Sequence, residues 1–254
     1  MKPVLLILSL LTAPGSLVAQ AIPSSVYAWN QAPVVKNAGY EERTLLTGST
    51  RDFSTFRVLG ITRLANQPEA APQQVAEETL VIVKEGELTL TTSGKTKTLG
   101  PGSIALIMPG DTHQLNNRSV RPLTYYLMQY RARQQPKPTL NQLAGGSMWV
   151  DWNDVAYQPN QKGGIRRIFD RATVMANRFE MHVTTLNAGL WSHPPHTHRA
   201  AEILLPIDNM AQESIDGKLH PASTGDVIFL ESDVPHAIQN TSAVGCTYFA
   251  FQFE

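Results

Sequence analysis

Short apolar or alternating segments, separated by turn residues, run along most of the chain. Residues 79–83 (TLVIV) form a β-branched apolar run, and residues 87–91 (ELTLT) alternate polar and apolar positions, as strands do. Ser93-Gly94 follows as the expected turn of a hairpin. We find no amphipathic helical periodicity over three turns. The pattern predicts an all-β protein whose short strands close into sandwiches or barrels.

The same plan occurs twice. An offset of 123 residues, the separation of Trp29 from Trp152, also aligns Gly102 with Gly225 and His113 with His236. Such matches spread over much of the chain indicate a duplicated domain. We therefore expect an N-terminal domain at 27–131, a polar linker with prolines at 132–149, and a C-terminal domain at 150–254.

The first residues have the pattern of an export signal. Lys2 precedes a short apolar run, and Ala19-Gln20-Ala21 supplies the small-x-small pattern of a cleavage site. This predicts a signal peptide at 1–21 and an exported protein, periplasmic or secreted, with no membrane association after cleavage. The single cysteine, Cys246, excludes an intramolecular disulfide. It lies in an apolar segment, so we expect a buried thiol.

The charged residues balance, with 21 basic and 21 acidic side chains. This balance gives no indication of a nucleic acid or an anionic membrane as partner. A small molecule is the expected ligand. The outer faces of barrel strands are also compatible with a homodimer.

The C-terminal domain concentrates residues that bind metals. His196 and His198 are two apart, so their imidazoles share one face of an extended chain. Glu202 can reach the same point only if the chain bends within 199–201. His236 follows a Val-Pro turn further along. Three imidazoles and one carboxylate suit one divalent transition ion, although the ligand types do not distinguish manganese, iron, nickel and zinc.

These segments resemble the two motifs of the cupin superfamily. The resemblance covers Gly189, the His196-x-His198-x-x-x-Glu202 segment and the segment from Gly225 through Pro235-His236 to Asn240. It implies a small antiparallel barrel of the jelly-roll or double-stranded β-helix type with the metal inside. Together with the duplication, it implies a bicupin, with two such barrels in tandem.

The N-terminal copy keeps His113 but has lost most of the ligand pattern. Our alignment places Glu78 at the position of Glu202, and Pro72 and Gln74 at those of His196 and His198. Two ligands hold a borderline ion poorly, so we expect this barrel to be metal-free, with His113 as a structural residue.

Other side chains are candidates for function. His193 and Arg199 are candidate catalytic residues, and Tyr248, Gln252 and Arg166 are candidate substrate-binding residues. Glu180 and His182 share one face of a predicted strand, opposite Phe179 and Met181. We expect this polar face to turn outward or toward another subunit.

The intact ligand set favours an enzyme acting on a small polar or acidic metabolite. A single metal in the second barrel of an exported bicupin resembles the architecture of ureidoglycine aminohydrolase, which implies hydrolysis. The ligand set is, however, the generic cupin one, which is equally similar to cupin dioxygenases, decarboxylases and sugar-modifying enzymes. The other alternative is a non-catalytic protein that binds a small molecule.

Overall fold

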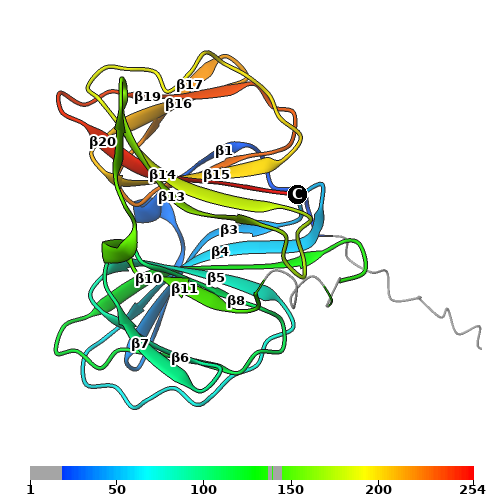
Figure 1. Ribbon diagram of the computed structural model, residues 1–254, viewed down its shortest axis with the longest axis vertical. Helices are drawn as coiled ribbons and strands as arrows, with labels where there is room; N and C mark the ends of the chain where they lie inside the picture. Colours follow the sequence, from blue (N-terminus) through cyan, green and yellow to red (C-terminus); the bar gives the residue numbers. More distant parts are fainter. Residues whose placement is uncertain (1–18, 137–138, 140–144) are drawn as a thin grey trace, which may run out of the picture.

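The computed structural model describes residues 19–136, 139 and 145–254, and its regular secondary structure consists almost entirely of strands (Figure 1). The first 18 residues of the expected signal peptide lie outside the described residues. The N-terminal copy forms β2 (Val34–Asn37), β3 (Tyr40–Gly48), β4 (Phe53–Arg63), β5 (Glu78–Glu85), β6 (Leu88–Thr92), β7 (Lys95–Leu99), β8 (Ile104–Ile107), β9 (His113–Asn116) and β10 (Leu123–Ala132). The C-terminal copy forms β12 (Gln158–Asn160), β13 (Gly163–Arg171), β14 (Phe179–Leu186), β15 (Ala201–Asp208), β16 (Ala211–Ile215), β17 (Lys218–Ala222), β18 (Val227–Leu230), β19 (His236–Asn240) and β20 (Cys246–Phe253). The all-β prediction is confirmed.

Each copy is a barrel made of one large and one small antiparallel sheet. The large sheets have seven strands each, ordered β11-β8-β5-β10-β4-β3-β2 and β1-β18-β15-β20-β14-β13-β12. The small sheets, β7-β6-β9 and β17-β16-β19, close the barrels at the two ends of the molecule (Figure 1). In the hairpins of the small sheets, Ser93-Gly94 and Asp216-Gly217 have positive φ at both positions, as a type I′ turn requires.

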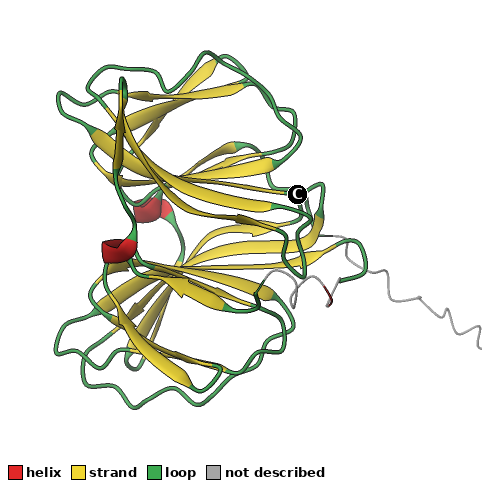
Figure 2. Cartoon of the chain, viewed as in Figure 1, coloured by secondary structure: helices red, strands yellow, loops and turns green. Residues whose placement is uncertain are grey.

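The two copies exchange their first strands. β1 (Ser25–Tyr27) pairs with β18 of the C-terminal barrel, whereas β11 (Met148–Val150) pairs with β8 of the N-terminal barrel. The short 3-10 helices η1 (Trp29–Gln31) and η2 (Trp152–Asp154) follow these strands and lead the chain back (Figure 2). The last residues of the expected linker, Met148 and Trp149, therefore belong to a strand. Neither of these 3-10 helices, nor any other helix in the described residues, could span a membrane.

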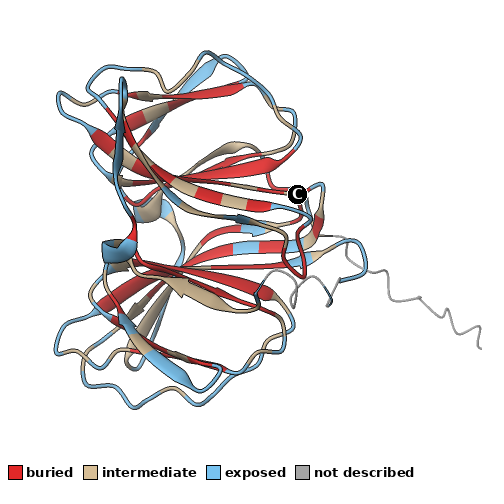
Figure 3. Cartoon of the chain, in the orientation of Figure 1, coloured by how far each residue is buried: buried red, intermediate tan, exposed pale blue. Residues whose placement is uncertain are grey.

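The largest apolar core lies between the barrels. It joins residues of both large sheets, and its aromatic rings meet across the boundary: Phe56 lies 5.1 Å from Phe253 and 6.0 Å from Phe229 between ring centroids. Two smaller apolar cores lie inside the barrels, one in each. Both faces of the central large-sheet strands are therefore largely buried, whereas the outer strands β2 and β12 are exposed (Figure 3).

This arrangement corrects one expectation. Phe179 and Met181 point into the core between the barrels. Since side chains alternate along a strand, Glu180 and His182 on the opposite face turn toward the interior of the C-terminal barrel. The expectation that this polar face turns outward or toward another subunit is therefore wrong.

Strand pairing also corrects the alignment of the two copies. Glu202 pairs with Gln252 and Leu230, and the residue that pairs with the equivalent Gln129 and Ile107 is Thr79. Glu78 pairs with Tyr130 and turns to the other face of the sheet. A shift of one residue reverses the facing of every side chain in a strand, so Glu78 is not the counterpart of Glu202.

The same correction applies before β5. Gln73 forms an isolated bridge with His113, as His196 does with His236. Gln73 and Val75, in place of Pro72 and Gln74, therefore answer to His196 and His198. The offset of 123 residues seen in the sequence also separates the starts of β5 to β10 from those of β15 to β20.

Candidate metal centre

The C-terminal barrel encloses a cavity of about 540 Å³. Its wall comes from the inner faces of β13, β14, β15, β19 and β20, and from the loop before β15. His196, Glu202 and His236 lie in this wall, together with Tyr248 and Gln252. The cavity thus has the size of a small-molecule site.

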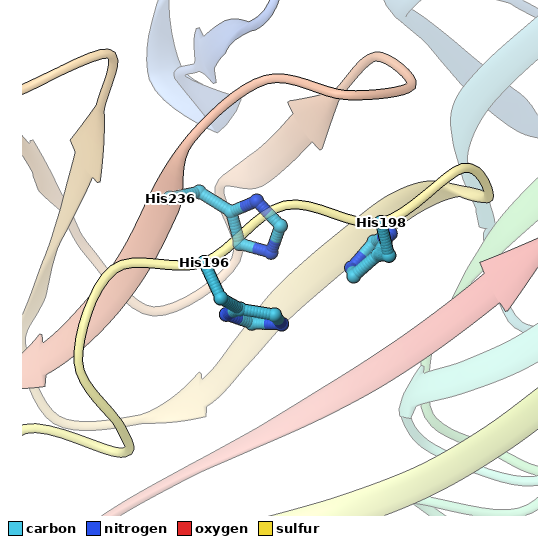
Figure 4. Close-up of side chains that lie close together, drawn as sticks. All are labelled: His196, His198 and His236. Atoms are coloured by element: carbon cyan, nitrogen blue, oxygen red, sulfur yellow. The ribbon is translucent and has the colours of Figure 1, made fainter.

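Three imidazoles converge at the cavity (Figure 4). The nitrogens that His196, His198 and His236 offer all lie within 4.8 Å of one another. Two backbone hydrogen bonds, of 3.1 and 3.0 Å, join His196 to His236 and fix the loop before β15 against the start of β19. Residues 199–200 form a bend, as the spacing required, and the bend brings the buried Glu202 to the same point.

Glu202 faces two of these imidazoles. Its Oε2 lies 2.9 Å from Nε2 of His198 and 3.0 Å from Nε2 of His236. Burial alone would raise the pKa of Glu202, but hydrogen bonds from the two histidines outweigh burial and lower the pKa to about 2. Glu202 is therefore an ionised carboxylate inside the barrel.

The Nδ1 atoms of the same two rings show where the hydrogens of these histidines lie. Nδ1 of His198 lies 2.7 Å from the carbonyl oxygen of Ala200, and Nδ1 of His236 lies 2.8 Å from that of Val234. A carbonyl oxygen only accepts, so both Nδ1 atoms carry hydrogen. A neutral ring then presents a lone pair at Nε2 to a carboxylate that is itself an acceptor. Either two extra protons or one cation must lie between them, and such carbonyl-oriented imidazoles are typical of metal ligands.

The histidines of the cluster differ in environment. Burial lowers the pKa of His196 and of His193, whereas the hydrogen bond with Glu202 raises that of His198. The His193 ring packs edge-on against His196 at 4.1 Å between centroids and lines the cavity. His193 is therefore placed to contact a ligand beside the ion site.

Two of the three candidate substrate-binding residues also line the cavity. Tyr248 is buried, and burial raises its pKa, so its hydroxyl is a neutral hydrogen-bonding group. Gln252 pairs with Glu202 across the sheet, and its Nε2 lies 3.3 Å from Nε2 of His198. Both are in position to orient a small polar ligand.

The two arginine candidates lie elsewhere. Arg199 is exposed and forms ion pairs with Asp52 of the N-terminal copy, at 2.8 Å, and with Glu254, at 3.0 Å. Arg166 stacks on Trp152 at 4.7 Å and donates to the carbonyl oxygen of Val155. Neither lines the cavity, and both contribute to packing.

Sequence reasoning did not place His182 and Glu180 together inside the barrel. His182 lines the cavity, and its Nδ1 lies 2.8 Å from Oε1 of Glu180. A carboxylate oxygen accepts, so Nδ1 donates to it, and in the neutral ring the lone pair then lies on Nε2. The alternation of this strand is the sequence signal, but it does not reveal which face is the interior.

Glu213 was missed altogether. It lies on β16 among the apolar residues that fill the barrel, is 0% exposed, and occupies the position of Leu90 in the other copy. Neither of its oxygens forms a hydrogen bond of normal geometry with a described residue. Burial raises its pKa well above the usual value, with the charge of Glu202 adding to the rise and the backbone of Ala237 opposing it.

Comparison with known domain families identifies both copies. Residues 65–129 match the family described as Cupin domain, and residues 181–254 match the AraC-like ligand binding domain. No curated protein sequence matches the chain.

Solved structures share the arrangement of the whole chain. AerE from Microcystis aeruginosa is 14% identical, with a TM-score of 0.70 over 91% of this chain and 100% of that one. Protein Ylba from E. coli is 17% identical, with a TM-score of 0.66 over 93% of each chain. The oxalate decarboxylase of Lactobacillus farciminis, solved as a formate complex, is 12% identical, with a TM-score of 0.69 over 91% of this chain and 86% of that one. At these identities the likeness shows the fold.

Proposed function

Because this chain is a bicupin, with two cupin barrels in tandem, we propose that it is a metal-dependent enzyme acting on a small polar or acidic metabolite. The proposal rests mainly on one observation: Oε2 of Glu202 lies within hydrogen-bond distance of the Nε2 atoms of His198 and His236. The four groups that would hold the ion are His196, His198, Glu202 and His236.

A bound divalent ion would polarise a carbonyl or carboxylate oxygen of the substrate. The protein would supply the rest. Tyr248 and Gln252 would hydrogen-bond the polar groups of the substrate and fix its orientation. Lys162 lines the same cavity, and its Nζ donates to the carbonyl oxygens of Trp191 and Ser192. Its charge favours an anionic substrate.

His182 is the candidate general base. Glu180 holds Nδ1 in its protonated form, which leaves Nε2 to take a proton from water or from the substrate. A histidine oriented by a carboxylate in this way is a recurrent arrangement for proton transfer. Such a base favours hydrolysis, the reaction of ureidoglycine aminohydrolase, among the reactions considered for this site.

Decarboxylation or dioxygenation is the second candidate. One of the solved structures that the chain is similar to is an oxalate decarboxylase with formate bound. A small carboxylate is therefore a substrate class to include, beside ureido acids.

Export is part of the proposal. Residues 1–21 have the pattern of a signal peptide. Ile22 is buried, and backbone hydrogen bonds of 2.9 Å join Ser49 to Gln20 and Ile22. Cleavage after Ala21 would leave Ile22 as the first residue, which keeps the hydrogen bond from the Ile22 nitrogen to Ser49 and removes the one to Gln20. N-terminal sequencing of the exported protein can check this cleavage site.

The first test is the metal content of protein purified without chelator. We expect the wild type to contain one ion per chain and the His236→Ala variant to contain none. His113→Ala is the matched control because it removes the equivalent histidine of the other barrel, and it should keep the full metal content. A wild type that stays metal-free after reconstitution with manganese, iron, nickel and zinc would contradict the proposal.

The second test assigns the reaction. The metal-loaded protein is incubated with ureido acids, small dicarboxylates and phenolic acids, and ammonia release, carbon dioxide release and oxygen uptake are measured. We expect His182→Gln to keep the metal and to lower turnover about 10²- to 10⁴-fold. Saturable binding without any turnover would instead identify a binding protein.

A further inference from the structure

The N-terminal barrel contains a second cavity, of about 430 Å³. It lies at the same place in its barrel as the metal cavity does in the other. Gln73, His113, Tyr125 and Gln129 line it, and they stand 123 residues before His196, His236, Tyr248 and Gln252 of the first cavity. Duplication has therefore kept the cavity, while the ligand set has been lost.

A permanent positive charge lies in this wall. Arg63 is the last residue of β4 and lines the cavity, at the position that Leu186 has in the C-terminal barrel. Its Nε is buried and has no hydrogen-bond partner among the described residues. Within the described part of the chain, no carboxylate oxygen lies within 4.0 Å of a side-chain nitrogen of Arg63, the distance that defines an ion pair. The guanidinium thus carries a charge that none of these carboxylates neutralises, and its Nε–H has no acceptor in that part of the chain.

The hydroxyl of Tyr125 accompanies this charge. Tyr125 is 3% exposed; burial raises its pKa, and the charge and hydrogen bond of Arg63 oppose the rise. On the other side of the cavity, Nδ1 of His113 donates to the carbonyl oxygen of Asp111 at 3.1 Å and leaves Nε2 to a ligand. A guanidinium and a phenolic hydroxyl in one wall are hydrogen-bond donors suited to a carboxylate.

We propose that the cavity of the N-terminal barrel binds a small organic carboxylate without a metal, and that Arg63 pairs with its negative charge. Arg63 and Tyr125 donate to the carboxylate oxygens, and Gln73 and His113 contact the remaining polar groups. This site does not depend on the metal centre, because it lies in the other barrel and uses none of its residues.

A negative group lies next to residues that line the same cavity. Glu42 on β3 pairs across the strands with Ile61, which lines the cavity, and accepts a hydrogen bond of 3.3 Å from the hydroxyl of Tyr40. Its charge repels an anionic ligand, so its removal should change the affinity in the opposite direction to removal of the Arg63 charge. Removing its charge should strengthen carboxylate binding, whereas removing the charge of Arg63 should weaken it.

The test uses the His236→Ala background, in which the metal centre cannot contribute. Titration calorimetry measures binding of oxalate, malonate and succinate, with succinamide as the uncharged analogue of succinate. We expect one saturable carboxylate site per chain and much weaker binding of succinamide. Arg63→Leu, which installs the residue of the other copy, should weaken carboxylate binding about 10- to 100-fold, because a charge-assisted hydrogen bond is lost.

Two further variants control the result. Arg118→Leu removes an exposed arginine paired with Glu69 and should leave binding unchanged. Glu42→Gln should tighten binding a few-fold. Absence of saturable carboxylate binding, or equal binding by the Arg63→Leu variant with its thermal unfolding unchanged, would overturn the proposal. The metal content of the wild-type protein is measured separately. A failure of the carboxylate site can therefore be distinguished from a failure of the metal centre.

Discussion

The two barrels share strands, register and cavity, yet their cavities have different chemistry. In the C-terminal barrel, His196, His198 and His236 lie together, and the carboxylate of Glu202 contacts the last two. In the N-terminal barrel the equivalent residues are Gln73, Val75, Thr79 and His113. The difference shows that the barrel itself holds a cavity open, and that a few inward positions decide what occupies it.

The comparison also separates two kinds of buried carboxylate. Glu202 has hydrogen-bonding imidazoles and ionises at low pH, whereas Glu78, one position out of register, turns to the core between the barrels. There Glu78 accepts hydrogen bonds from the hydroxyl of Tyr130 and, at 3.0 Å, from the backbone N–H of Met175. Glu78 therefore connects the two copies and does not belong to either cavity.

The largest expected effect comes from grafting the ligand set. A variant with Gln73→His, Val75→His and Thr79→Glu has four potential ligands in the N-terminal barrel, because His113 is already there. We expect it to bind two metal ions per chain, one more than we expect of the wild type. Metal analysis checks this, and the His113→Ala version of the graft should return to one ion. A graft that folds but gains no ion would show that the cavities differ in more than these positions.

A smaller effect is expected at the contact between the copies. Glu78→Ala leaves two buried donors, the Tyr130 hydroxyl and the Met175 N–H, without an acceptor. We expect it to lower the free energy of unfolding by about 3 kcal/mol. Denaturant unfolding measures the change, and Tyr130→Phe should cost less because it removes only one donor. Equal stability of Glu78→Ala and wild type would show that the two hydrogen bonds contribute nothing.

The smallest effect concerns the carboxyl that has no counterpart in the N-terminal barrel. Glu213→Leu makes the position like Leu90 and should raise the free energy of unfolding at pH 7 by about 1 to 2 kcal/mol, because an unpaired buried polar group is removed.

Glu213→Gln tests the pH dependence at the same position. The pKa of Glu213 is raised in the folded protein, so the folded state binds its proton more tightly than the unfolded state does. Its contribution to stability is complete below the unfolded pKa of 4.5 and is lost as the pH rises toward the folded pKa. Unfolding of metal-free protein from pH 4 to pH 8 should show this loss in the wild type and less of it in Glu213→Gln. The same slope in both would exclude Glu213 as its source.

Much of the fold could be predicted from the chain because its causes are local. Alternation of side chains, type I′ turn residues and the offset between Trp29 and Trp152 predict strands, hairpins and duplication without knowledge of the packing. The ligand set was found for the same reason, since His196, His198 and Glu202 are close in sequence and the required bend is short. Whether this set binds a metal stays a prediction.

Other features could not be predicted. Alternation shows that a strand has two faces, but here one face lines a barrel and the other packs against the second barrel. On β14 the face with Glu180 and His182 is polar and half-buried, a pattern that is also typical of a strand facing solvent, so the sequence could not reveal that this face turns to the inside of the barrel. The contact of Arg199 with Asp52 and the exchange of β1 and β11 likewise join residues that are far apart in the chain.

The sequence by itself determined that this protein is a duplicated all-β chain and which residues gather near His236. Local propensities and spacing are sufficient for that. Only the tertiary structure decided which face of each strand became the inside of a barrel, since that choice depends on what the opposite face packs against. The same packing put Glu78 between the barrels and Glu213 inside one of them. It also put Arg63 in the wall of a cavity that keeps only His113 of the candidate ligand set.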